Sequence, residues 1–319
     1  MNNIHIALAA NHRYLPGLLV TMVSIVRSCS DKQRLIFHVF SDGLSSEDKD
    51  KVQELTVKYG APPPQFLEPD MTPIKAKFGA YKQAHTAFLR LFLCEFLDVD
   101  WVLYTDVDTL WLRDICELWE LKDDSVMLQW CLDLPSTHEC VRTYAKWFDD
   151  FNKVKYGCSG VALMNLAKMR RTDFTTQCKN FADKWGTPFF VDQDILNYVC
   201  RNDSALLPGV WDCLIPTREA VNGLVYHFTG IGSMFNSSFA GWRPLYYPWF
   251  RFYYDFVLEQ QQRPACSLFK RLIFWLLGSF YPNRKLIAFL LRRAHYHWTD
   301  NIERQLFFAW LWRHAKWLW

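Results

Sequence analysis

Short apolar runs alternate with segments of helical periodicity along the first 110 residues of this 319-residue chain. The runs at residues 4–10, 35–40 and 101–104 have the length of buried strands, and helical patterns lie at residues 16–27 and 45–59. Because strands that alternate with helices pair in parallel through helical crossovers, this order predicts an α/β fold. We expect a mostly parallel central sheet with helices on both faces.

Further elements are expected beyond residue 80. Residues 86–96 and 110–121 have helix-like spacing, and residues 126–130 and 160–165 are apolar enough to form strands. Hydrophobic residues make up 50% of the chain, which is enough for the core of one large domain with an appendage.

The pattern breaks at a Gln-Gln-Gln-Arg-Pro stretch, so we expect a domain over residues 1–263 and a separate segment over residues 264–319. That segment carries 9 Lys and Arg against 2 Asp and Glu, and residues 286–293 and 302–319 resemble amphipathic helices rich in Trp. Trp favours membrane interfaces and cations favour anionic headgroups, so we expect binding to an anionic membrane surface. An ordinary helical cap is the alternative, and no nucleic-acid-binding motif accompanies the charge.

The compartment is predicted from what the sequence does not contain. The N-terminus shows no basic stretch of a secretory signal peptide, and the ten Cys have no regular spacing, which favours reduced cytoplasmic thiols. No apolar run reaches the roughly 20 residues that span a bilayer. We therefore expect a cytoplasmic protein that associates with a membrane peripherally.

Two carboxylates one residue apart, Asp106 and Asp108, follow the apolar run at residues 101–104. In an extended chain residues i and i+2 point the same way, so both side chains would meet at the edge where open α/β sheets bind ligands. Two carboxylates on one side repel unless a cation lies between them, and hard oxygen ligands suit Mg²⁺ or Mn²⁺. An ordinary turn or helix cap is the alternative interpretation.

Seven stretches follow one another in the order of a known family. They are residues 6–14 with Ser24-Ile25, Phe88-Leu89-Arg90-Leu91, residues 104–108, residues 156–166, Asp192-Gln193-Asp194-Ile195-Leu196-Asn197, Leu207-Pro208 with Trp211-Asp212, and His227-Phe228-Thr229-Gly230. Over roughly residues 4–250 the chain thus resembles the retaining glycosyltransferases of family 8, which include bacterial lipopolysaccharide and lipooligosaccharide galactosyl- and glucosyltransferases. The resemblance implies a GT-A fold, a Rossmann-like domain, and a location at the inner face of the bacterial inner membrane.

The resemblance also implies a set of site residues. The implied metal ligands are Asp106, Asp108 and His227, and an imidazole beside two carboxylates suits Mn²⁺ better than Mg²⁺. Gln193 is implied at the reactive face of the sugar, where an amide stabilises the developing cation or supports same-face attack; Asp192 would hold sugar hydroxyls. Contacts to the UDP-sugar are implied for Ala9, Ala10, Asn11, Tyr14, Arg90, Asp106, Val107, Asp108, Ser159 and Gly230.

Each of these assignments has an alternative. An isolated histidine such as His227 is more often a locally hydrogen-bonded core or surface residue, and acidic residues such as Asp192 are common in the first turn of a helix. The sequence also departs from the family. Asn11 replaces a common Asp, Cys158 replaces an Asn in an Asn-Ser-Gly segment, and Ser233 stands where a Lys is usual.

The residues and the resemblance together predict a retaining, Mn²⁺-dependent glycosyltransferase that moves galactose or glucose from UDP onto a lipopolysaccharide, lipooligosaccharide or similar glycan acceptor. A catalytically silent relative that binds a nucleotide sugar or a glycan is the alternative, motivated by Cys158 and Ser233. A nucleotidyltransferase is disfavoured, because its Gly-rich phosphate loop is absent near the N-terminus.

Overall fold

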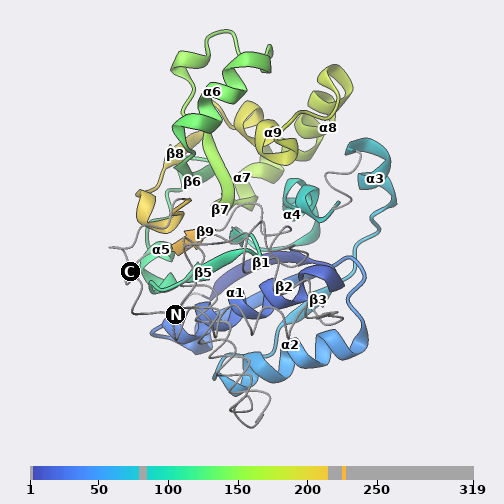
Figure 1. The fold of residues 1–319 in the computed structure, drawn as a ribbon, viewed down its shortest axis with the longest axis vertical. Coiled ribbons are helices and arrows are strands. Elements are labelled where there is room, and N and C mark those ends of the chain that lie inside the picture. The colour runs from blue at the N-terminus through green and yellow to red at the C-terminus, as the bar shows by residue number, and fades with distance from the viewer. Residues whose placement is uncertain (1–2, 79–84, 215–224, 228–319) are drawn as a thin grey trace, which may run out of the picture. The chain divides into compact units, whose positions relative to one another are not determined.

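A computed structural model describes residues 3–78, 85–214 and 225–227 (Figure 1). A seven-stranded sheet in the order β3-β2-β1-β4-β7-β6-β8 forms its centre, and a two-stranded sheet joins β5 and β9. The strands are β1 (Ile4–Ala10), β2 (Leu35–Ser41), β3 (Gln65–Leu67), β4 (Trp101–Thr105), β5 (Thr109–Trp111), β6 (Leu128–Leu132), β7 (Gly157–Asn165), β8 (Ser204–Leu206) and β9 (Val225–His227).

The central sheet is mostly parallel, as the sequence predicts. Strand β1 pairs in parallel with β2 and β4, and β2 with β3, whereas β7 runs antiparallel to both β4 and β6. The N-terminal end of β7 therefore lies at the same edge as the C-terminal ends of β1, β4 and β6. Candidate site residues from these four strands therefore lie at one edge of the sheet.

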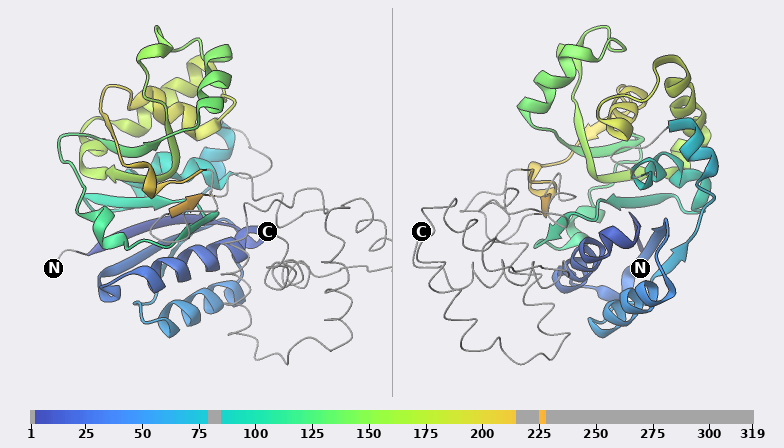
Figure 2. Two further views of the ribbon diagram at one scale, coloured as in Figure 1. Left: turned by 60° about the vertical axis from the view of Figure 1, so that its left-hand side comes forward. Right: turned by 45° about the vertical axis from the view of Figure 1, so that its right-hand side comes forward.

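Helices cover both faces of the sheet, which confirms the expected layers. Figures 1 and 2 show α1 and α2 on one side of β1 and β2, and α7, α8 and α9 on the opposite side of the sheet. The α-helices are α1 (Leu15–Ser28), α2 (Ser46–Lys58), α3 (Thr72–Phe78), α4 (Leu93–Phe96), α5 (Ile115–Trp119), α6 (Pro135–Tyr144), α7 (Leu166–Arg171), α8 (Phe174–Trp185) and α9 (Val191–Val199). The 3-10 turns are η1 (His12–Tyr14), η2 (Lys32–Arg34), η3 (Thr86–Phe92), η4 (Phe151–Lys153) and η5 (Gly209–Trp211).

Local sequence signals explain several of these elements. Ser45 and Asp48 form a reciprocal capping box that begins α2, as the Ser and acidic residues at its start indicate. Strands β4 and β7 are buried along their whole lengths, because helices cover both faces of the sheet. Small residues on β1, Ala7 and Ala9, join one continuous core with residues of η3, α4, α8 and α9.

Two expected elements differ in the structure. The helix predicted over residues 110–121 is wrong in its first half, because residues 109–111 pair as a strand with β9 from far along the chain. The helix predicted over residues 86–96 is a 3-10 turn through residue 92 and an α-helix only afterwards. In that turn the Arg90 side chain donates to the backbone carbonyl of Ala87 at 3.0 Å.

The predicted boundary at residue 263 and the basic, aromatic segment at residues 264–319 lie outside the described residues. Among the described helices, none combines the length and the apolar character that a membrane-spanning segment requires.

Candidate active site

Three side chains, two from the connection between β4 and β5 and one from the end of β9, converge at the sheet edge. Asp106 follows β4, Asp108 precedes β5, and His227 is the last residue of β9, directly opposite Thr109 in the β5–β9 register. The Nε2 atom of His227 lies 3.2 Å from Asp108 Oδ1 and 3.8 Å from Asp106 Oδ2. One ligand atom from each residue lies within 4.8 Å of the others, which is a spacing that one metal ion can bridge.

The two aspartates converge through a turn, which corrects the extended conformation expected from their spacing. Val107 and Asp108 occupy a turn between β4 and β5, and Val107 is buried in it. The Thr109 hydroxyl stabilises this turn by donating to the Asp106 carbonyl at 2.9 Å. The i, i+2 spacing therefore brings the carboxylates together by a different local geometry from the one we inferred.

The other ring nitrogen of His227 contacts a further carboxylate, Asp212, which sequence reasoning did not assign to the site. The His227 Nδ1 atom lies 3.0 Å from Oδ1 of the buried Asp212, which leaves Nε2 facing Asp106 and Asp108. Burial alone would lower the pKa of His227, but the carboxylates of Asp212 and Asp108 raise it well above its ordinary value. These carboxylates therefore favour the protonated imidazole in the metal-free protein, and a metal ion that binds Nε2 would displace that proton.

Strand β7 is shaped around this histidine. A side chain at Gly160 would overlap the His227 ring, so only glycine fits there. The Gly160 carbonyl accepts from the Asp106 N–H at 2.8 Å, which ties β7 to the residue that begins the turn. Cys158, where the family usually has Asn, is buried with its Sγ atom 3.6 Å from His227 Nδ1. The thiol therefore contacts the histidine.

Arg90 is the buried cation of the site. Its guanidinium donates to Asp106 Oδ1 at 2.7 Å and to the Ser159 carbonyl at 2.6 Å, and its Nε forms an ion pair with Asp192 Oδ2 at 3.0 Å. It also lies over the Tyr104 ring, 4.1 Å from the centroid. Burial opposes the charged form, but Asp106 and Asp192 together raise the pKa of Arg90. This arginine therefore pairs with two carboxylates at once and joins the Asp106 side of the site to α9.

Asp192 lies in the first turn of α9, in an unusual backbone setting. The preceding residue, Val191, has φ 38°, which is in the left-handed region that β-branched residues rarely adopt. Asp192 is buried, and its desolvation raises its pKa to about 6 even though Arg90 favours the ionised form. Asp194, which the sequence pairs with it, instead accepts from the Tyr144 and Tyr156 hydroxyls at 2.8 and 2.6 Å.

The Gln193 amide is fixed at both ends. Its Oε1 accepts from the Ser159 N–H at 3.0 Å, and its Nε2 donates to Asp133 Oδ2 at 2.7 Å. Asp133 is buried, and desolvation raises its pKa. Sequence reasoning missed Asp133, although the available signal was the same as for Asp106: a carboxylate that directly follows an apolar strand, here β6.

Four further residues for which the resemblance implies contacts to the UDP-sugar lie at the end of β1 or directly after it. Ala9 and Ala10 are the last two residues of that strand and are buried, and Tyr14 is the last residue of η1. The Asn11 Oδ1 atom is buried and has no hydrogen-bond partner within the described structure. An acceptor in this state fits a ligand that brings an N–H group. Gly230 lies outside the described residues.

Solved structures define the class of fold. The galactosyltransferase LgtC, in complex with donor and acceptor sugar analogues, superposes with a TM-score of 0.62 at 24% identity; the match covers 71% of this chain and 87% of LgtC. The bifunctional glycosyltransferase WbbM superposes with a TM-score of 0.59 at 17% identity, over 72% of this chain and 46% of WbbM. The fold is therefore the GT-A fold of glycosyltransferases.

Sequence comparison gives the family. The model of glycosyl transferase family 8 matches residues 5–230, and the chain belongs to that family. General stress protein A of Bacillus subtilis is 24% identical over 66% of this chain and 73% of its own length. Glucoside xylosyltransferase 2 of Mus musculus is 30% identical over 61% of this chain, which corresponds to 48% of the mouse protein. A putative glycosyltransferase of Haemophilus influenzae is 26% identical over 62% of this chain and 59% of its own length.

Proposed function

We propose that the chain is a retaining hexosyltransferase that moves galactose or glucose from a UDP-sugar to a glycan acceptor of the lipopolysaccharide or lipooligosaccharide kind. The observation that carries this proposal is the convergence of Asp106, Asp108 and His227 beside Gln193 and Asp192 at one sheet edge. Family membership supports the reaction class, and the sugar and acceptor rest on the resemblance of the motifs.

The donor set fits a divalent ion that serves a diphosphate, with Mn²⁺ as the favoured ion and Mg²⁺ as the alternative. Two carboxylates and an imidazole are suitable ligands, and both aspartates are partly exposed, so phosphate oxygens can complete the coordination. Such an ion supplies Lewis-acid charge that stabilises the UDP leaving group. Asp212 orients His227 toward this position through Nδ1.

The residues of α9 are suited to the sugar end of the donor. An amide is a poor nucleophile, and Gln193 is held rigidly between Ser159 and Asp133, so it is suited to stabilising positive charge on the sugar ring. Asp192, the neighbouring carboxylate, is paired with Arg90 and holds sugar hydroxyls in this proposal. A solved structure of similar fold is an active-site variant of LgtC in which glutamine is replaced by glutamate, which supports a glutamine at such a site.

Release of UDP tests the reaction. The full-length protein, stripped of metal with EDTA, is given UDP-galactose or UDP-glucose, a lipooligosaccharide acceptor and then Mn²⁺. We expect Mn²⁺-dependent UDP release with one of the two donors and a product with the α-configuration of the donor, seen by NMR of the anomeric proton. A folded protein that binds the donor without releasing UDP would support the catalytically silent alternative.

We further propose that residues 264–319 form a unit separate from residues 1–263 and bind the anionic inner face of a bacterial inner membrane. The basic and aromatic composition of this segment supports the proposal. Co-sedimentation with vesicles that contain anionic lipid should fall as salt rises, and reversal of charge at Lys270, Arg271, Arg292 and Arg293 should abolish it. Equal binding to neutral vesicles would contradict the electrostatic account.

A further inference from the structure

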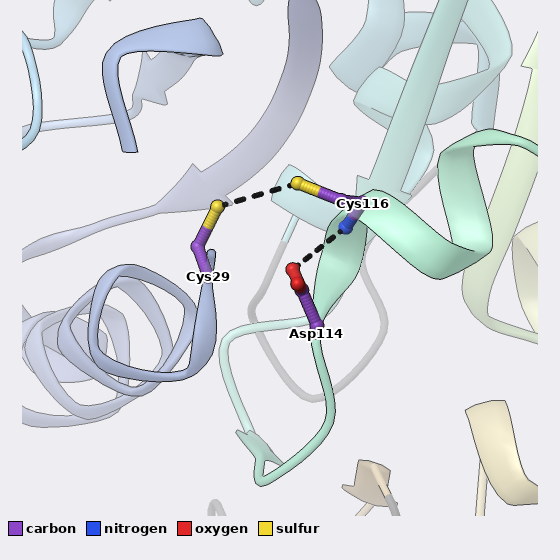
Figure 3. A group of neighbouring side chains, drawn as sticks. All are labelled: Cys29, Asp114 and Cys116. Carbon is purple, nitrogen blue, oxygen red and sulfur yellow. Dashed lines mark hydrogen bonds between the residues drawn. The ribbon is translucent and has the colours of Figure 1, made fainter. Parts of the chain in front are cut away.

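Three side chains gather at a second place in the domain, where the end of α1 meets the start of α5 (Figure 3). Cys29 is the residue at which the chain leaves α1, Asp114 is the N-cap of α5, and Cys116 lies in the first turn of that helix. The two Sγ atoms lie 3.7 Å apart, and one ligand atom from each of the three residues lies within 4.8 Å of the others. None of the three belongs to the candidate active site.

The spacing of the sulfur atoms indicates which chemistry suits this cluster. A disulfide requires an S–S distance of about 2.05 Å, so the observed pair is not in bonding geometry. Two thiolates on one tetrahedral zinc ion, with Zn–S bonds of about 2.3 Å, stand about 3.8 Å apart. The observed 3.7 Å matches that arrangement without movement of either helix.

The third ligand is already positioned. Asp114 accepts from the Cys116 N–H at 3.0 Å through Oδ1 and from the Ser30 N–H at 3.2 Å through Oδ2. These two bonds hold the carboxylate between the chain segments that carry the cysteines. Each carboxylate oxygen has a further lone pair, and Asp114 and Cys116 are partly exposed, so a metal ion can enter from solvent and keep a water as its fourth ligand.

We propose that Cys29, Asp114 and Cys116 form a binding site for a thiophilic divalent metal ion of the zinc class. The site joins α1 to α5 across the segment that contains β5. Strand β5 is itself bonded to α1, because Thr21 donates to the Thr109 carbonyl at 2.8 Å and the Trp111 N–H donates to Ser24 at 3.0 Å. The bound ion therefore stabilises the packing of α1 behind the turn that carries Asp108.

Binding is coupled to loss of a proton. The ligand to such an ion is the thiolate rather than the thiol, so the ion must displace a proton when the Cys29 sulfur becomes a ligand. The affinity for the ion is consequently expected to rise with pH between 6 and 8.

Cobalt absorption tests the site, because Co²⁺ replaces zinc and its bonds to thiolates give intense charge-transfer bands. We expect the full-length protein, reduced with a phosphine, to develop such a band that saturates at one thiolate-bound Co²⁺ per chain. Cys29→Ser and Cys116→Ser should lose it. Cys140→Ser, on α6, is the matched control and should keep it, as should Cys158→Ser, which removes the thiol beside His227.

Alkylation of the wild-type chain provides a second measurement that needs no variant to fold. Zn²⁺ should slow the reaction of iodoacetamide with Cys116 at least tenfold and leave that of Cys140 unchanged, as read by peptide mass spectrometry. Absence of a cobalt band, a band that survives in both Cys29→Ser and Cys116→Ser, a band lost only in Cys158→Ser, or equal alkylation with and without Zn²⁺ would each overturn the proposal.

Discussion

At the scale of single residues, the metal-free site pairs two cationic side chains with four carboxylates. Arg90 is shared by Asp106 and Asp192, and His227 is shared by Asp108 and Asp212. Each of these four carboxylates therefore has a cationic partner, which offsets part of the cost of keeping ionised groups at low exposure.

Gly160 is the residue at which this arrangement is most easily disturbed. Gly160→Ala places a methyl group inside the His227 ring, so the imidazole or strand β7 must move. We expect a loss of about 1–3 kcal/mol in the free energy of unfolding, the usual cost of overpacking, together with weaker Mn²⁺ binding. Urea unfolding and metal titration measure the two effects.

The matched control is Gly209→Ala, because nothing lies within 4 Å of the side chain that it would add. It should change the free energy of unfolding by less than about 0.5 kcal/mol. Equal free energies of unfolding for the two variants would contradict the close contact between Gly160 and the His227 ring.

Asp192 gives a prediction about pH. Its pKa is raised in the folded state to about 6, from an ordinary value of 3.8, so its stabilising contribution is complete below pH 4 and is lost as pH rises through 6. The loss is on the order of 3 kcal/mol at most. In metal-free buffer, the free energy of unfolding of Asp192→Asn should fall less than that of the wild type between pH 4 and 7. Parallel curves for the two proteins would contradict the assignment.

Site residues that are neighbours in the sequence are easier to predict than those that come together only in the folded structure. Asp106 and Asp108 are recognisable because they adjoin each other after an apolar strand. Asp133 carries part of this signal, since it directly follows strand β6, but no second carboxylate lies two residues beyond it. The contacts of Asp133 and Asp212 with Gln193 and His227 cannot be predicted from sequence spacing, because those residues come from other elements. Whether a metal ion binds is likewise a matter of geometry that no spacing in the sequence specifies.

At the scale of elements, the first turn of α9 separates two aspartates that look equivalent in the sequence. Asp192 faces Arg90 and Ser159, whereas Asp194 accepts from two tyrosine hydroxyls and from the Phe190 N–H at 2.9 Å. Asp192 thus belongs to the candidate site, and Asp194 fixes the start of the helix.

Asp194→Ala tests this division of roles. It leaves the buried Tyr156 hydroxyl, the partly buried Tyr144 hydroxyl and a backbone N–H without their acceptor, so we expect a loss of about 2–4 kcal/mol in the free energy of unfolding. Thermal or urea unfolding measures it. Asp183→Ala, which removes an exposed partner of Lys77, is the control and should cost less than about 1 kcal/mol. Comparable losses in both variants would contradict the structural role of Asp194.

Elements defined by local periodicity were the most predictable. The three apolar runs in the first 110 residues are strands, and the capping signal at Ser45 does begin a helix. The helix prediction was wrong for residues 109–111 because their partner strand β9 is distant in the sequence, and pairing with it overrides the local helical pattern.

At the scale of the whole described structure, the sheet order explains why the site is where it is. One reversed strand, β7, brings its own N-terminal end, with Ser159 and Gly160, to the edge where β1, β4 and β6 end. The parallel part of this sheet follows from the strand–helix alternation. The reversal of β7 does not, because an apolar run carries no information on its direction.

Binding of Mn²⁺ followed by electron paramagnetic resonance tests the central claim most directly, because the signal of free Mn²⁺ disappears when the ion binds. In the presence of UDP we predict one tight site per chain, and at least a tenfold loss of affinity in Asp106→Ala, Asp108→Ala and His227→Ala, with far-UV circular dichroism unchanged. Wild-type Mn²⁺ affinity in all three variants would contradict the claim that these side chains hold one ion.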